Sequence, residues 1–353
     1  MNKSDVVIGV TGLNATDNPG PGISVIRSLR HDPEFKGKII GLSYDALDPG
    51  NFSNYADTVY LIPYPSEGED ALKNRLKYII SQTGMQVCIP TLDSELPGFN
   101  AISDDLEEAG CKMFLPTNEQ YKMRSKTSLP ELGAAASIRV PAQRVIASKN
   151  DVYSLHEQFI FPLVIKGVFY GAEICHSVED ASIAYDKMVA QWGVPVIVQE
   201  FISGTEFDVV AVGDGKGGLV GAVPMKKMYM TDKGKGWSGI VVKGDELMDM
   251  THKFTKATNW RGPCELEILR TATGEHFLLE VNPRFPAWTF LSAGAGVNLP
   301  MAVSQLASGS EPDVMPEPDA GTMFVRISLD QITHVDQFQH IVANGECHGM
   351  ESK

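Results

Sequence analysis

The chain has 353 residues, of which 43% are hydrophobic and 21% are charged, and its formal net charge at pH 7 is −14. This composition is typical of a soluble globular protein with two or three domains, and it excludes a fibrous or disordered chain. The acidic excess argues against a nucleic acid or a membrane surface as partner, because binding to either needs basic patches.

Two further patterns place the protein in a reducing, cytoplasmic setting. The start of the chain lacks the pattern of a secretory signal, and no stretch reaches the roughly twenty apolar residues of a membrane span. The cysteines form no C-x-x-C pair and their number is odd, which predicts reduced thiols. They are Cys88, Cys111, Cys175, Cys264 and Cys347.

Residues 1–118 predict an α/β domain with a parallel sheet, because strand-like and helix-like runs alternate. The expected strands are 6–10, 38–42, 58–62 and 87–90, and the expected helices are 22–30 and 70–82. The loop 11–22 follows the first strand, and Asp93 and Glu95 follow the last, at the edge where open α/β sheets bind ligands. The two acids either recognise a substrate amine or stabilise the start of the next helix.

Residues 119–209 predict a second unit of helices and strands. The expected helices are 118–133 and 178–191, and the expected strands lie near 144–147, 163–166 and 196–200. Lys166 ends an apolar strand, where a lysine must find an anion or reach water. It is therefore either a phosphate ligand or a lysine that extends into solvent.

Residues 210–353 predict a third unit of antiparallel strands, with a strand from 219 to Lys227, a loop at 231–239 and a last strand at 321–327. Its most informative part is a hairpin. Two apolar runs, 264–269 and 277–281, flank Thr273 and Gly274, which suit a two-residue turn.

A turn centred on Thr273 and Gly274 puts Glu267 directly opposite Glu280, with Asn282 further along the same face. Facing carboxylates destabilise a strand pair, and a bound cation removes the conflict. Carboxylate and amide oxygens suit Mg²⁺, whose remaining ligands are often substrate phosphates. Glu265 has the same strand parity and is the alternative first ligand if the register differs.

The order of these motifs resembles the ATP-grasp superfamily, and Glu-Val-Asn-Pro-Arg at 280–284 is most similar to a single ATP-grasp unit of the carbamoyl-phosphate synthase large subunit. The resemblance implies a Rossmann-like pre-ATP-grasp domain followed by a two-subdomain ATP-grasp fold, α/β overall and α+β in the catalytic unit. It also implies that 167–172 is the phosphate lid, although Phe169 and Tyr170 replace the expected glycines.

The same resemblance implies the roles of individual residues. The expected ATP ligands are Lys126 (with Lys122 as the alternative), Lys166, the hinge residues Glu200, Phe201 and Ile202, and the ribose-binding Glu206. The expected ligands of Mg²⁺ are Glu267, Glu280 and Asn282. Two Mg²⁺ ions are expected, and Mn²⁺ is expected to be able to replace them. The expected catalytic residues are Arg284, Lys166 and Lys227, and further polar candidates are His176 and Arg261.

The expected activity is an ATP- and Mg²⁺-dependent carboxylate–amine ligase that forms an amide or peptide bond through an acyl phosphate and releases ADP and phosphate. The alternatives are synthesis of carboxyphosphate or carbamoyl phosphate, and a non-catalytic ATP-binding regulatory subunit. The expected partners are a small carboxylate and an amine, with amino acids and peptides as options, and a homodimer is a further expectation.

Overall fold

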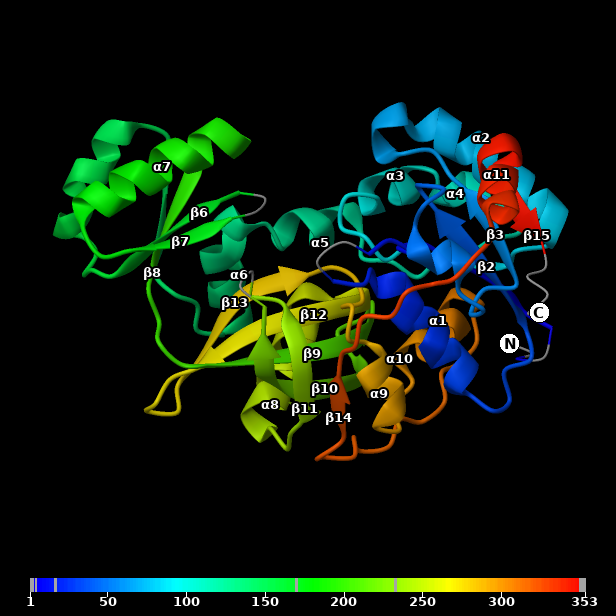
Figure 1. The fold of residues 1–353 in the computed structure, drawn as a ribbon. Helices are drawn as coiled ribbons and strands as arrows, with labels where there is room; N and C mark the ends of the chain where they lie inside the picture. The colour runs from blue at the N-terminus through cyan, green and yellow to red at the C-terminus, as the bar shows by residue number, and fades with distance from the viewer. Residues whose placement is uncertain (1–2, 4, 16–17, 169–170, 232–233, 349–353) are drawn as a thin grey trace.

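The computed structural model describes residues 3, 5–15, 18–168, 171–231 and 234–348, and its strands form three sheets (Figure 1). The strand orders are β15-β3-β2-β1-β4, β5-β8-β6-β7 and β13-β12-β9-β10-β11-β14. None of the described helices is long and apolar enough to span a bilayer.

The first sheet confirms the predicted alternation of strands and helices. Four of its strands are parallel: β1 (Val7–Val10), β2 (Lys38–Ser43), β3 (Thr58–Leu61) and β4 (Val87–Ile89). The helices are α1 (Pro21–His31), α2 (Glu69–Thr83), α3 (Leu96–Ala101) and α4 (Ser103–Glu108), with short 3-10 turns at Pro49–Phe52 and Pro65–Glu67. Helix α1 packs in one hydrophobic core, and α2, α3 and α4 pack in another, so both faces of the sheet are covered.

The end of the chain returns to this first sheet. Helix α11 (Val335–Asn344) leads into β15 (Glu346–His348), which pairs antiparallel with β3. Arg75 of α2 donates hydrogen bonds to the carbonyl oxygens of Leu61 and Gly345, at 2.8 and 2.7 Å, and so fastens the returning segment. The predicted third unit, 210–353, therefore contains a segment that packs on the first unit, and the division at 118 and 209 stays a prediction.

Ile341 anchors this segment, since it is fully buried while its neighbour Val342 is 58% exposed. We expect Ile341→Ala to lower the free energy of unfolding by about 2 to 4 kcal/mol, because it removes buried methyl groups and leaves a cavity. The matched control Val342→Ala should change it by less than about 0.5 kcal/mol. Chemical denaturation followed by circular dichroism measures both; equal values for the two variants would show that α11 is not anchored through Ile341.

The second sheet is small and antiparallel. Its strands are β5 (Gln143–Ile146), β6 (Leu163–Gly167), β7 (Ala172–Cys175) and β8 (Val196–Glu200). Helix α7 (Val178–Trp192) and the 3-10 segment Lys149–Glu157 supply Ala181, Met188 and Leu155 to the core beneath it. Phe169 and Tyr170 of the predicted lid lie outside the described residues.

The predicted helix 118–133 is broken into three pieces: α5 (Asn118–Met123), a 3-10 turn (Lys126–Ser128) and α6 (Leu129–Ala136). Pro130 lies in the first turn of α6, where its missing N–H group costs no helical hydrogen bond, but it could not continue a helix from α5. Leu129 and Leu132 pack in the core of the third sheet, so α6 joins that layer.

The third sheet is the largest and is antiparallel throughout. Its strands are β9 (Thr205–Asp214), β10 (Leu219–Met230), β11 (Gly236–Val241), β12 (Arg261–Arg270), β13 (His276–Asn282) and β14 (Met323–Val325). Helix α8 (Asp245–Thr258) packs in one of its cores, and α9 (Phe290–Gly294) and α10 (Leu299–Ala307) pack in a core shared with α1 and β1. The predicted loop 231–239 was too long, since β11 begins at Gly236.

Candidate active site

The β12–β13 hairpin has the predicted register at its acidic residues. Glu267 pairs with Glu280, and Glu265 pairs with Asn282. The predicted two-residue turn is wrong, because the last strand pair is Arg270 with His276 and the turn between them is wider. A shift of register after Glu267 compensates for this difference, so the carboxylates still face each other.

A third carboxylate continues this row across the sheet. Asp208 on β9 lies directly opposite Glu267, so Asp208, Glu267 and Glu280 stand side by side on three adjacent strands. Sequence reasoning missed Asp208, although its alternation with Glu206 along β9 places both side chains on one face. The row gathers negative charge at one face of the sheet.

Lys227 on β10 balances part of that charge. Its ammonium nitrogen lies 3.0 Å from Glu206 Oε2, 3.3 Å from Asp208 Oδ1 and 3.6 Å from Glu267 Oε2. The lysine side chain is only 6% exposed. Burial alone lowers the pKa of Lys227, but the three carboxylates raise it above its ordinary value, so the lysine is charged. The predicted ribose ligand Glu206 is thus engaged by Lys227 in this structure.

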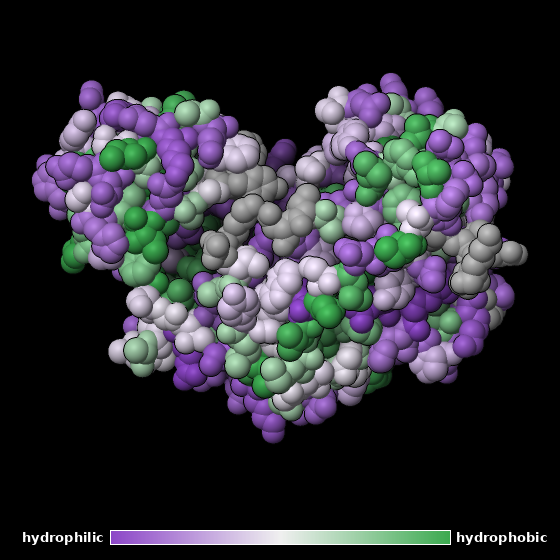
Figure 2. Space-filling model, viewed as in Figure 1, coloured by the Kyte–Doolittle hydropathy of each residue, from purple (hydrophilic) through white to green (hydrophobic). Residues whose placement is uncertain are grey.

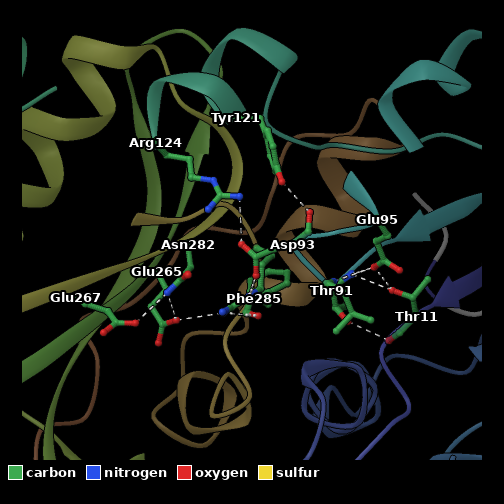
Figure 3. A network of polar contacts seen from close by, with 12 residues as sticks. Thr11, Thr91, Asp93, Glu95, Tyr121, Arg124, Glu265, Glu267, Asn282 and Phe285 are labelled. Atoms are coloured by element: carbon green, nitrogen blue, oxygen red, sulfur yellow. Dashed lines mark hydrogen bonds and ion pairs between the residues drawn. The ribbon is translucent and has the colours of Figure 1, made fainter. Parts of the chain in front are cut away.

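Asn282 and the nearby Arg284 organise the other end of the hairpin, where Figure 3 shows Asn282 beside Glu265 and Glu267. The Asn282 amide nitrogen donates to Glu265 Oε2 and Glu267 Oε1, both at 3.0 Å, which orients its amide oxygen away from these acids. Glu265 also accepts hydrogen bonds from Arg284 at 3.1 Å and from the Trp288 indole at 2.7 Å. Glu265 is therefore occupied by three donors, and Glu267 is the better placed of the two candidates for a first metal ligand.

A pocket lies between the small sheet and the large one, and it contains both predicted nucleotide lysines. Its lining residues are Lys126, Leu129, Gln143, Lys166, Ile197, Gln199 and Leu279. Figure 2 shows the surface hollowed between the lobe of the small sheet and the first domain. Lys126 Nζ lies 3.4 Å from Glu280 Oε2, so the pocket adjoins the row of carboxylates. The apolar lining residues lacked a sequence signal of their own.

The pKa values of Glu280 and Lys166 are both shifted toward the neutral form of the side chain. Burial raises the pKa of Glu280, and the facing Glu267 adds to the effect. Burial lowers the pKa of Lys166, and nearby Lys126 adds to it. A cation bound beside Glu280 and an anion bound beside Lys166 would stabilise the charged forms of both side chains. A metal ion bound together with a phosphate supplies both charges.

The predicted hinge and the remaining lysine candidate are also located. Glu200 ends β8 and accepts a hydrogen bond from the backbone N–H of Ala142 at 3.1 Å, and Phe201 and Ile202 follow it in the connection to β9. Lys122 lies exposed on α5, whereas Lys126 lines the pocket. The structure thus favours Lys126 over Lys122.

The two further polar candidates, His176 and Arg261, lie in structural roles instead, and the thiol of Cys175, next to His176 in the sequence, is buried. His176 is exposed just before α7, where its backbone N–H donates to Asp180. Arg261 donates to the carbonyl oxygens of Met113 and Leu115 and so joins the first domain to β12. Burial raises the pKa of Cys175 to about 11, so this thiol is protonated and unreactive at neutral pH.

The two acids after β4 lie at the predicted edge of the sheet, Glu95 is the residue at the N-terminal cap of α3, and recognition of a substrate amine stays a prediction. Asp93 forms ion pairs with Arg284 and Arg124, and Glu95 is 1% exposed and accepts hydrogen bonds within its own domain. Neither side chain caps α3. Asp93 takes its ion-pair partners from residues far along the chain, whereas Glu95 combines the nearby Thr91 and Leu92 with the distant Thr11 and Tyr44.

Comparisons with known proteins give relatives along part of the chain. Residues 193–328 match a family described as ATP-grasp in the biosynthetic pathway with Ter operon. A D-alanine–D-alanine ligase of Pseudomonas entomophila (strain L48) is 26% identical over 176 residues, which cover 46% of this chain and 53% of that protein. The ligase of the same name from Ectopseudomonas mendocina (strain ymp) is 27% identical, with 46% and 54% covered. The chain thus spans about half the length of these curated relatives.

Solved structures share the fold over most of the chain. Biotin carboxylase from Campylobacter jejuni has a TM-score of 0.70 at 16% identity, covering 91% of this chain and 75% of that one. N5-carboxyaminoimidazole synthetase from Staphylococcus aureus, complexed with ADP, has a TM-score of 0.68 at 13% identity, with 90% and 82% covered. L-amino acid ligase from Bacillus licheniformis has a TM-score of 0.64 at 15% identity, with 86% and 74% covered. At such identities the likeness establishes the fold alone.

Proposed function

Because the chain carries an ATP-grasp domain within an ATP-grasp fold, we propose that it is an ATP- and Mg²⁺-dependent carboxylate–amine ligase. In this reaction a substrate carboxylate attacks the γ-phosphate of ATP, which gives ADP and an acyl phosphate. An amine then displaces phosphate and forms an amide or peptide bond. The observation that carries the proposal is the meeting of the carboxylate row with the pocket of Lys126 and Lys166.

The donor set suits Mg²⁺ that is shared with a nucleotide. Glu267, Glu280 and the amide oxygen of Asn282 supply hard oxygen ligands on one face of the hairpin. Among the described residues, no three acidic, histidine or cysteine side chains form a metal cage of their own. An ion with few protein ligands needs substrate phosphates to complete its octahedron, which is the usual arrangement for Mg²⁺. Bound there, Mg²⁺ would neutralise phosphate charge during transfer.

The side chains would act by positioning and by charge. Lys126 and Lys166 would bind the phosphates from the pocket, and Arg284 would stabilise the transferred phosphoryl group. Lys227 holds Glu267 and Asp208 in place through its ion pairs. No side-chain nucleophile is required, because the substrate carboxylate itself attacks.

The named relatives support this class of reaction. The curated relatives are D-alanine–D-alanine ligases, and one structural neighbour is an L-amino acid ligase, so we propose an amino acid or small peptide among the substrates. Two Mg²⁺ ions, replaceable by Mn²⁺, belong to the proposal, and MgADP is named in one structural neighbour. A cytoplasmic setting fits the five cysteines, which form no disulfide. Dimerisation stays a prediction.

A second candidate is carboxyphosphate or carbamoyl-phosphate chemistry, which is supported by the likeness to biotin carboxylases, one of them solved with bicarbonate. The two candidates are separated by measuring ADP release with Mg²⁺-ATP and a panel of amino acids, short peptides and bicarbonate. Release that needs both an acid and an amine, with a condensed product in the mass spectrum, supports the ligase. Release stimulated by bicarbonate alone supports the second candidate, and ATP binding without release supports a regulatory subunit.

We expect Lys126→Met and Lys166→Met each to weaken ATP binding by about 10- to 100-fold, because each removes a charge-assisted contact worth roughly 1.5 to 3 kcal/mol. Lys122→Met is the matched control, since that lysine is exposed outside the pocket and should leave affinity unchanged. Calorimetric titration with Mg²⁺-ATP measures the three values. Equal affinities for Mg²⁺-ATP in all three variants would show that neither Lys126 nor Lys166 binds the nucleotide.

A further inference from the structure

The loop between β4 and α3 is bound together by the buried carboxylate of Glu95 (Figure 3). This carboxylate accepts hydrogen bonds from the backbone N–H groups of Thr91 and Leu92, at 2.6 and 2.8 Å. The hydroxyl groups of Thr11 and Tyr44 donate to it as well. Four donors on one buried acid fix the loop, because releasing any of them would leave a buried polar group unpaired.

The same loop carries Asp93, whose contacts come from later parts of the chain. Arg284, 191 positions away in sequence, donates from Nε to Asp93 Oδ2 at 2.9 Å. Arg124 Nη2 lies 3.6 Å from Asp93 Oδ1, and the Tyr121 hydroxyl donates to the Asp93 backbone oxygen at 3.2 Å. The loop after β4 therefore contacts Arg284, just beyond β13, through this aspartate.

Arg284 is shared between two acids. Nε binds Asp93, and Nη1 binds Glu265 at 3.1 Å. Two hydrogen bonds to acids on different sides fix the plane of the Arg284 guanidinium. Neither of these two bonds uses Nη2. The free end of the group then has a defined direction, which a single bond to Glu265 would not give.

We infer that Asp93 is a positioning residue, which holds the Arg284 guanidinium from the loop after β4 so that its remaining N–H groups meet the γ-phosphoryl group of ATP. The nature of this anion rests on the proposed function. Asp93 itself lies outside the nucleotide pocket, whose lining comes from other elements. Its loss should therefore affect the terminal phosphate and leave the rest of the nucleotide bound as before.

The test compares the affinities for two nucleotides and requires no turnover. Wild type, Asp93→Asn, Asp93→Glu and Arg284→Gln are titrated with the Mg²⁺ complexes of ADP and of the β,γ-imido analogue of ATP. Asp93→Asn keeps the shape of the side chain but removes its charge, and the nearest guide is the roughly 10- to 100-fold typically lost with a residue that orients a metal ligand. We expect the preference for the triphosphate analogue over ADP to fall about 10-fold in Asp93→Asn and to recover in part in Asp93→Glu. A double variant, Asp93→Asn with Arg284→Gln, is titrated as well, and its preference should be no lower than that of Arg284→Gln alone.

The matched control is Asp105→Asn, which breaks an exposed ion pair with Lys77 in the same domain and should leave the preference unchanged. A wild-type preference in Asp93→Asn overturns the inference, and so do losses that add up in the double variant, because Asp93 would then act without Arg284. Circular dichroism confirms folding, and Asp93→Glu provides the answer if Asp93→Asn does not fold. Failure of the proposed function is separate, since it would appear as wild-type protein that binds nucleotide without acid-dependent ADP release.

Discussion

Glu280→Gln is expected to reduce acid-dependent ADP release by at least about 100-fold, since a metal ligand should matter at least as much as the groups that support one. The variant keeps the size of the side chain but removes the negative charge that faces Glu267 across the hairpin. We also expect the Mg²⁺ concentration that gives half-maximal release to rise. A coupled assay for ADP over a Mg²⁺ series measures both quantities.

The hairpin offers a matched control for this variant. Glu275 lies near its turn and pairs with Arg139 on the surface, so Glu275→Gln should behave as wild type. Release by Glu280→Gln at the wild-type rate, with an unchanged Mg²⁺ requirement, would contradict the metal assignment of this hairpin. A loss of equal size in both variants would indicate a general effect on the hairpin.

Lys227→Met is expected to lower the free energy of unfolding by about 3 to 5 kcal/mol and to remove activity, because it leaves buried carboxylates without their cation. Asp208 is 2% exposed, and burial already raises its pKa, so it cannot turn to water when the lysine is lost. Denaturant unfolding measures the stability. The double variant Lys227→Met with Asp208→Asn should recover part of the loss, since the unpaired charge is removed with its partner.

Lys253→Met is the control that separates the effect of burial from the loss of an ion pair. Lys253 pairs with Asp249 at 2.6 Å on the surface of α8, where both side chains are largely exposed. Such pairs contribute about 0 to 1 kcal/mol, so this variant should be close to wild type. Equal stability losses at Lys227 and Lys253 would show that the ammonium of Lys227 does not balance the carboxylate row.

The elements with strong local patterns were predicted well. The predicted helices 22–30, 70–82 and 178–191 differ from α1, α2 and α7 by at most one residue at either end. Their apolar spacing and their boundaries are local properties of the sequence. The pairing of Glu267 with Glu280 was also predicted, although from a two-residue turn that is wrong, because a shift of register after Glu267 compensates for the wider turn.

What the sequence did not reveal depends on contacts between distant segments. Asp208 joins the carboxylate row only through the pairing of β9 with β12. The bond between Asp93 and Arg284 joins the loop after β4 to the segment after β13, and β15 pairs with β3 nearly 290 positions earlier. No local pattern carries such information, since each partner by itself is an ordinary polar residue or a short strand.

The central claim is that a substrate carboxylate attacks ATP, and transfer of an oxygen isotope tests it most directly. An acid found active in the substrate panel is labelled with ¹⁸O in its carboxylate and is incubated with the amine, Mg²⁺-ATP and the protein. The account predicts that the phosphate released carries one ¹⁸O from the carboxylate, because the acyl phosphate breaks on the carbonyl side. Amide formation with unlabelled phosphate would contradict the acyl phosphate and with it the proposed mechanism.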